Sequence, residues 1–143
     1  MTQFGPETRE NSRSGAGKSA ATVLVVDDEP LTLWSMAEVL GERGHRVIVA
    51  GDAASAFQAL ATADSVPELV FLDLSLPDST DLAALSVIHR CSPRTAIVLM
   101  TAHGSPELFR DARRRGAAAV VDKPFEMSDI GSLADRILSA RSS

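Results

Sequence analysis

Short apolar runs alternate with longer segments of helical periodicity from Thr22 onward. Continuous apolar runs are typical of strands in a parallel sheet that helices cover on both faces. The predicted strands are Val23–Val26, Arg46–Ala50, Leu69–Leu72, Ala96–Met100 and Ala118–Val121. The predicted helices are Pro30–Arg43, Ala53–Ala63, Leu82–Arg90, Pro106–Arg115 and Ser128–Ala140. Such strand–helix units in series predict an α/β fold with right-handed crossovers and a doubly wound sheet.

The length of 143 residues is enough for one domain with a substantial core. Residues 1–20 are rich in Gly, Ser, Thr, Arg and Glu and contain almost no large apolar side chains. Such a composition predicts a disordered N-terminal tail, because it cannot bury enough apolar surface to order the chain. The folded domain is then expected to cover residues 21–143.

Charge and cysteine content limit the classes of function. A net charge of −5 and a pI near 5.1 argue against a general nucleic-acid-binding protein. No apolar segment is long enough for a membrane-spanning helix or resembles a secretory leader. Cys91 has no second cysteine with which to form an internal disulfide. We therefore expect a cytoplasmic protein that binds neither nucleic acid nor membranes.

Charged side chains follow three of the predicted strands at the points where those strands end. Asp27 and Asp28 follow the first strand, Asp73 follows the third, and Lys123 follows the fifth. Ligands of open parallel sheets bind outside the carboxyl ends of the strands, so these side chains should converge. Three clustered carboxylates repel one another unless a hard cation such as Mg²⁺ neutralises them. The neighbouring lysine indicates an anionic second ligand, most simply a phosphoryl group.

Four segments, in this order, resemble the motifs of response-regulator receiver domains, the CheY-like modules of bacterial two-component signalling. They are Val25–Pro30, Phe71–Pro77, Met100–Ala102, and Gly116-Ala117 leading to Lys123-Pro124-Phe125. The resemblance covers residues 22–140. It implies a flavodoxin-like sheet of five parallel strands in the order 2-1-3-4-5, covered by five helices.

The resemblance also implies which oxygen atoms act at the site. Asp73 is expected to accept the phosphoryl group and become an acyl phosphate, as carboxylates do in covalent catalysis. Asp28 is expected to bind Mg²⁺ directly and Asp27 mostly through water. Asp73 and the backbone carbonyl of Ser75 are expected to complete the protein ligands, because Mg²⁺ needs few carboxylates.

Three further residues are expected to contact the phosphoryl group. Lys123 should neutralise its charge. In the family the bond to Pro124 is cis, which turns the lysine ammonium toward the acids. Thr101 should hydrogen-bond a phosphoryl oxygen and pull the following loop inward. The backbone N–H of Ala102 should donate to the same group.

Three positions bear on the switch and on access to the site. Val120 stands where the family usually has an aromatic side chain that moves with the switch hydroxyl, so Thr101 and its loop, or the fourth helix, are expected to carry the signal. Asp81 replaces a common glycine, which predicts a different shape for the loop after Asp73. His103 is expected either to line access to the site or to be a solvated loop histidine.

Other side chains are expected on the surface. Trp34 lies off the apolar face of the first predicted helix, so it should be exposed as an interface anchor or pack on the last helix or the tail. The run Arg113–Arg115 is expected to be a solvated helix end or a binding site for phosphate or an acidic partner. Cys91 is expected to be a half-buried loop thiol.

The function implied is that of a stand-alone receiver. A sensor histidine kinase or a histidine phosphotransfer protein would phosphorylate Asp73, and the receiver would then signal to a downstream protein effector; the sequence leaves homodimer formation open. An alternative is a degenerate receiver that acts as a constitutive adaptor. A small phosphatase is disfavoured, because Ser75 stands where such enzymes place a second acid. We expect no enzymatic turnover beyond self-phosphotransfer and autodephosphorylation.

Overall fold

The computed structural model describes residues 20–80 and 82–142. Apart from the exposed Ala20, the expected tail lies outside these residues, and so does Asp81. The strands are β1 (Thr22–Val26), β2 (Arg46–Ala50), β3 (Leu69–Asp73), β4 (Ala96–Thr101) and β5 (Ala119–Asp122). The helices are α1 (Pro30–Glu42), α2 (Ala53–Thr62), α3 (Ala83–Cys91), α4 (Pro106–Arg114) and α5 (Met127–Ser142). None of these described helices has the length and apolarity that crossing a bilayer requires.

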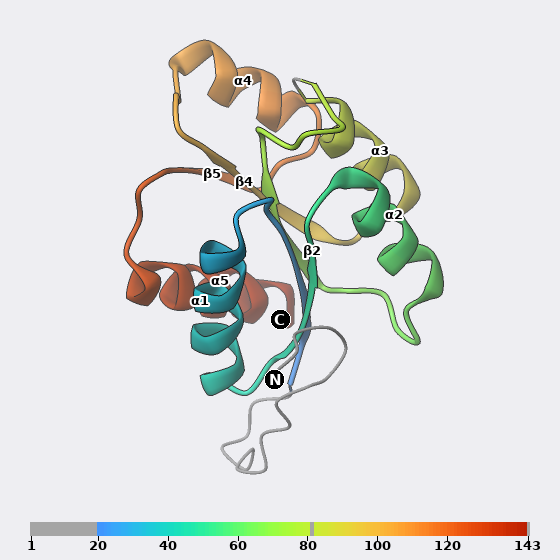
Figure 1. Cartoon of the computed structure of the whole chain (residues 1–143), viewed down its shortest axis with the longest axis vertical. Coiled ribbons are helices and arrows are strands. Elements are labelled where there is room, and N and C mark those ends of the chain that lie inside the picture. The colour runs from blue at the N-terminus through green and yellow to red at the C-terminus, as the bar shows by residue number, and fades with distance from the viewer. Residues whose placement is uncertain (1–19, 81, 143) are drawn as a thin grey trace.

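The strands form one parallel sheet in the order β2-β1-β3-β4-β5, which confirms the predicted fold (Figure 1). The chain moves from β1 to β2 on one side and then crosses to β3 on the other. This reversal places the carboxyl ends of β1 and β3 next to each other, with Val26 paired with Leu72. A crevice at such a reversal is where ligands of doubly wound sheets bind.

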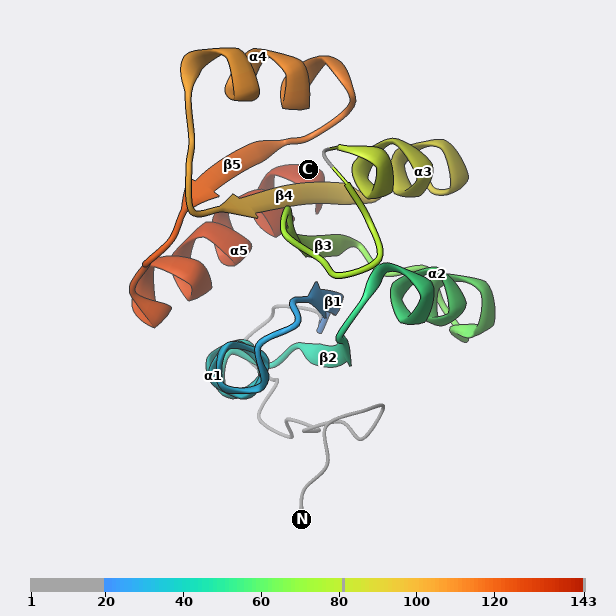
Figure 2. The ribbon, with the colours of Figure 1, turned by 45° about the horizontal axis from the view of Figure 1, so that its top comes forward.

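Helices cover both faces of the sheet, as the continuous apolar runs predict (Figure 2). Successive strand residues point to opposite faces. Leu24 and Val70 therefore pack toward α2, α3 and α4, while Val25 and Phe71 pack toward α1 and α5. These four side chains are completely buried. Burial on both faces explains why Val23–Val26 of β1 and Leu69–Leu72 of β3 are all apolar, with aspartates only at or just beyond the strand ends.

Local signals explain several of the helix ends. Pro30 begins α1, where its fixed φ and missing N–H cost nothing. Gly44, with φ of 95°, follows the end of that helix in a conformation that favours glycine. Asp52 and Ser105 cap α2 and α4 by accepting backbone N–H groups of the first turn.

Element boundaries differ from the predictions by one or two residues at several ends. β5 begins and ends one residue later than expected, so that Asp122 belongs to the strand. Helix α3 extends through Cys91, and its thiol is exposed. The prediction of a half-buried loop thiol is therefore wrong, because Cys91 lies on the solvent side of the last helical turn.

A polar cluster that the sequence did not reveal joins the amino-terminal edge of the sheet to α5. His45 is buried, and its Nδ1 accepts the Ala21 N–H at 3.4 Å. Its Nε2 lies 3.2 Å from Asp135 Oδ1, and Arg43 pairs with the other oxygen of the same carboxylate. Burial alone would raise the pKa of Asp135, but the hydrogen bonds with His45 and Arg43 outweigh it and lower the pKa. The cluster holds α5 against the end of α1.

Candidate functional site

The three aspartates gather at the reversal point between β1 and β3. Carboxylate oxygens of Asp27, Asp28 and Asp73 all lie within 4.8 Å of one another. Asp27 is completely buried and Asp73 is 4% exposed, whereas Asp28 is exposed to solvent. The strand ends thus produce the convergence that the sequence predicts, with one solvent-facing acid and two acids beneath it.

Lys123 provides the cation of this cluster. Its Nζ lies 2.7 Å from Asp27 Oδ2 and 3.5 Å from Asp73 Oδ1. The bond between Lys123 and Pro124 is cis, as the resemblance implies. The Lys123 N–H donates to the carbonyl oxygen of Thr101 at 2.7 Å, which ties the end of β5 to the end of β4. The lysine therefore binds Asp27 more closely than the residue expected to carry the phosphoryl group.

The charges of the cluster perturb one another. Burial, followed by the negative charge of Asp27, raises the pKa of Asp73. Burial would lower the pKa of Lys123, but its hydrogen bond with Asp27 and the two nearby carboxylates outweigh burial and raise that pKa. The buried acids thus hold the lysine in its charged form. Three carboxylates share this single ammonium group, so the charge around Asp73 is not fully neutralised.

Backbone groups fix the orientation of the buried acids. The Glu29 N–H donates to Asp27 Oδ1 at 2.9 Å, and the Ser75 N–H donates to Asp73 Oδ1 at 3.2 Å. Asp78 anchors the loop after β3, because its two oxygens accept the N–H groups of Ala53 and Ala54 at the start of α2. Sequence reasoning missed Asp78, because it lies 25 residues along the chain from Ala53 and no local capping signal marks so distant a contact.

The residues expected to act as the switch lie beside the cluster. Thr101 is buried at the end of β4 and pairs with Asp122 of β5. Its Oγ1 accepts the His103 N–H at 3.1 Å, so the hydroxyl already organises the turn that follows it. Ala102 and His103 are both exposed. The Asp122 carboxylate lies against Gly104, where an added Cβ would meet Oδ1 at 2.4 Å.

The donor set fits Mg²⁺. This ion prefers oxygen ligands at about 2.1 Å, so two ligand oxygens on one ion lie at most about 4.2 Å apart. The carboxylate oxygens lie within 4.8 Å of one another, which is close to this limit. The net negative charge of the cluster favours a cation as well. That Asp27, Asp28, Asp73 and the Ser75 carbonyl hold it stays a prediction.

Two other expectations concern the surface. Trp34 is 49% exposed on α1, and Leu31, one turn earlier, is 68% exposed. The prediction that Trp34 points away from the apolar face is thereby confirmed. Val120 is half-buried and lines a groove of about 600 Å³ between β5 and α5, together with Phe125 and Arg136.

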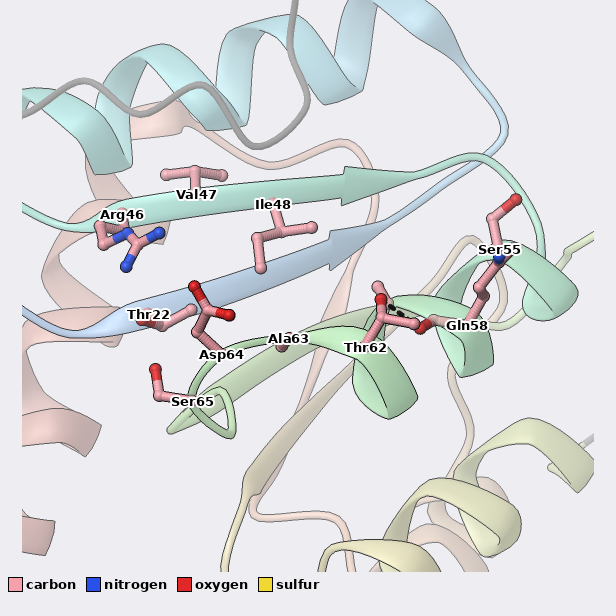
Figure 3. Close-up of a pocket in the computed structure, with 11 residues that line it drawn as sticks. Thr22, Arg46, Val47, Ile48, Ser55, Gln58, Thr62, Ala63, Asp64 and Ser65 are labelled. Carbon is pink, nitrogen blue, oxygen red and sulfur yellow. Dashed lines mark hydrogen bonds between the residues drawn. The ribbon is translucent and has the colours of Figure 1, made fainter.

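A second groove, of about 440 Å³, lies between the edge strand β2 and α2 (Figure 3). Arg46 and Asp64 lie at one end of it and Ser55 at the other, with Ile48 between them. None of the clustered aspartates lines this groove, and neither does Lys123. It is therefore separate from the acid cluster.

Comparison with known proteins agrees with this geometry. PdtaR of Mycobacterium tuberculosis, a transcriptional regulatory protein, is 35% identical over 111 residues, covering 76% of this chain and 52% of that protein. The DNA-binding transcriptional regulator NtrC of Azospirillum brasilense is 30% identical over 122 residues, covering 85% of this chain and 25% of that protein. The chain thus spans about a quarter to a half of these curated relatives.

A solved structure and a family model complete the comparison. The receiver domain of NtrX from Brucella abortus superposes with a TM-score of 0.73 at 38% identity, covering 82% of this chain and 98% of that one. The family model for the response regulator receiver domain matches residues 23–135. This match includes the acid cluster, Thr101 and Lys123. The chain belongs to the response regulator receiver domain family.

Proposed function

We propose that the protein accepts a phosphoryl group on Asp73 from a sensor histidine kinase or a histidine phosphotransfer protein. One observation supports this most strongly: an almost fully buried carboxylate lies beside a lysine and two further acids at the reversal point of the sheet. A structural role alone does not account for burying two carboxylates so close together, because clustered charges destabilise the fold when nothing neutralises them.

The proposed reaction is a direct displacement at phosphorus. A carboxylate oxygen of Asp73 attacks the phosphorus atom, and the bond from phosphorus to the imidazole nitrogen of the donor histidine breaks. The products are an acyl phosphate on Asp73 and a free imidazole. Asp27, Asp28, Asp73 and the Ser75 carbonyl would hold Mg²⁺, which supplies charge neutralisation for the phosphoryl oxygens when bound.

Lys123 and the backbone of the β3–α3 loop prepare this reaction. The Ser75 N–H orients the Asp73 carboxylate, and Asp78 holds the loop that carries that N–H. We infer that Lys123 turns from Asp27 toward the phosphoryl oxygens when they arrive, since they carry more charge. Phosphoryl transfer depends mainly on positioning and on charge neutralisation, and these residues provide both.

Signalling then rests on the loop after β4. The Thr101 hydroxyl would exchange its bond with the His103 N–H for one with a phosphoryl oxygen, and the Ala102 N–H would donate to the same group. A ligand shifts a conformational equilibrium only through contacts that differ between the two states. The half-buried Val120 offers packing but no such polar contact. The loop and α4 are therefore the proposed route of the signal.

The proposal extends to the cellular role. The protein would act in the cytoplasm as a stand-alone receiver, without turnover beyond self-phosphotransfer and autodephosphorylation, and would change its affinity for a protein effector. A degenerate receiver that serves as a constitutive adaptor is the second candidate. Val120 in place of the switch aromatic favours the second candidate, whereas the complete acid cluster with Lys123 favours the first.

The test is phosphorylation by a small-molecule donor. The protein is incubated with Mg²⁺ and acetyl phosphate, and intact mass is recorded for the wild type and for Asp73→Asn. A mass increase of one phosphoryl group in the wild type alone is expected. The same increase in Asp73→Asn would reassign the acceptor, and no increase in either protein would favour the adaptor.

A further inference from the structure

Charge is distributed unevenly over the described chain. Residues 82–118, which include α3, β4 and α4, carry six arginines and two acids, a net charge of +4. The other described residues carry five basic and fourteen acidic side chains, a net charge of −9. A cationic region on an otherwise anionic protein attracts acidic partners and orients them as they approach.

Two contacts join the end of α4 to α3, and both helices lie on the same face of the sheet (Figure 2). Arg115 Nη1 donates to Ser86 Oγ at 3.2 Å. The His89 ring lies against Gly116, where an added Cβ would be 2.5 Å from the ring Cγ. Five exposed arginines lie on these two helices or just beyond α3, and we call them the basic corner: Arg90, Arg94, Arg110, Arg113 and Arg114.

Most of the basic corner lacks an intramolecular counter-ion. Arg114 lies 3.6 Å from Asp111, but both side chains are exposed, so this pair contributes little. Within residues 20–80 and 82–142, the other four arginines of the corner form no ion pair. Interaction with the carbonyl groups at a helix end accounts for arginines in a last turn. It does not account for Arg94, which lies beyond α3, or for Arg110, which lies in the middle of α4.

We propose that the basic corner docks a short acidic segment of a protein partner. Guanidinium groups bind carboxylates through paired hydrogen bonds, which favours arginine over lysine at such a surface. Val87 is 39% exposed one turn before Arg90 and offers an apolar contact beside the charges. A long polyanion such as nucleic acid would extend past the corner onto the anionic remainder of the surface, where it would be repelled. A short acidic peptide would not.

The position of the corner separates this contact from phosphorylation. Helices α3 and α4 run antiparallel to the strands, so they end at the amino-terminal edge of the sheet, whereas Asp73 lies at the carboxyl edge. A partner docked on the corner would leave the acid cluster open to a phosphoryl donor. The inference therefore goes beyond the proposed function and does not depend on it.

The test compares two charge-reversed variants of the full chain. The corner variant is Arg90→Glu with Arg113→Glu, and the control is Arg136→Glu with Arg141→Glu on α5. Both change the net charge equally at exposed arginines. Binding of a fluorescein-labelled oligo-glutamate peptide is measured by anisotropy, and thermal melts check that each variant is folded. We expect the corner variant to bind about tenfold more weakly than wild type and the control to stay within about twofold.

Salt and competing ligands complete the experiment. Added salt should weaken the wild-type binding, because exposed charges are screened. An equal loss in the control, or no binding by the wild type at low salt, would overturn the proposal. Tighter binding of an oligothymidylate of equal charge would overturn it in favour of nucleic acid. Self-association that only the corner variant loses would assign the surface to a second copy. Both variants should still gain the phosphoryl mass if the proposed function holds.

Discussion

Replacing Asp73 by Asn is expected to stabilise the metal-free protein. The substitution keeps the size of the side chain but removes a negative charge that is 4% exposed and within 4.8 Å of two other carboxylates. Because burial and Asp27 raise the pKa of Asp73, its charged form is less favourable in the folded protein than in the unfolded chain. The amide carries no such cost.

The magnitude follows from three opposing contributions. Repulsion between unit charges 4.8 Å apart is about 3 kcal/mol at an effective dielectric constant of about 20. Attraction to Lys123 Nζ at 3.5 Å is about 5 kcal/mol on the same scale, so it offsets this repulsion and part of the repulsion from the second, better-screened carboxylate. Desolvation of the carboxylate, which costs a few kcal/mol, is partly offset by the Ser75 N–H. The remaining gain is about 1–2 kcal/mol, or roughly 3–8 °C in Tm for a domain of this size.

The assay is thermal and urea unfolding in EDTA across a range of pH. A carboxyl group with a raised folded-state pKa stabilises the protein fully below its ordinary value of 3.8, and this stability is lost as pH rises through the folded-state pKa. The advantage of Asp73→Asn should therefore be absent in acid, grow as pH rises above 3.8, and become constant once the pH exceeds the raised folded-state pKa. A variant less stable than wild type at neutral pH, or an equal difference at all pH values, would refute this reasoning.

Three further predictions concern the metal, the switch and the fold. Asp28→Ala should leave the stability of the metal-free protein within about 0.5 kcal/mol of wild type, since the side chain is exposed. It should abolish the rise in Tm that Mg²⁺ and a beryllofluoride phosphoryl mimic cause in the wild type. A rise that persists would show that Asp28 is not a metal ligand. Thr101→Ala should still gain the phosphoryl mass, yet NMR should show little change in the β4–α4 loop, and wild-type shifts would contradict its role as the switch. Gly116→Ala should lower the free energy of unfolding in urea by about 2–3 kcal/mol, because φ is +111° and the new Cβ meets His89. Adding His89→Ala should recover only the steric part of this loss. Full recovery would show that backbone strain contributes nothing.

The fold was predictable because the signals for β1 and β3 are unambiguous. The runs Val23–Val26 and Leu69–Leu72 are apolar without interruption, which indicates burial on two faces, and the aspartates that follow them mark one edge of the sheet. The prediction for Cys91 was wrong because it depended on where the last turn of α3 ends. Helix ends are determined by a balance of backbone hydrogen bonds that sequence patterns resolve only to a residue or two.

The site was predictable as a set of residues but not as an arrangement. Strand ends place Asp27, Asp73 and Lys123 together, yet nothing in the sequence indicates that the ammonium lies closer to Asp27 than to Asp73. That preference depends on side-chain conformations in three dimensions. The contact of His45 with Asp135 escaped prediction for the same reason, because the partners lie 90 residues apart.

The short contact between Lys123 and Asp27 affects how readily dissolved anions can bind to the lysine. Where inorganic phosphate or small organic phosphates are present, a Lys123 side chain without a partner beside Asp73 would bind them, and such binding would resemble the proposed phosphorylated state. Any dissolved phosphate must first displace the buried Asp27 carboxylate, which lies 2.7 Å from Lys123 Nζ. A phosphoryl group covalently attached to Asp73 can displace Asp27 from the lysine, since its local concentration is far higher than that of any dissolved ion. The unmodified protein should therefore show no shift of the Lys123 signals when titrated with phosphate by NMR, and saturable shifts would contradict this account. Under the proposed function, this contact would limit false activation before any signal arrives.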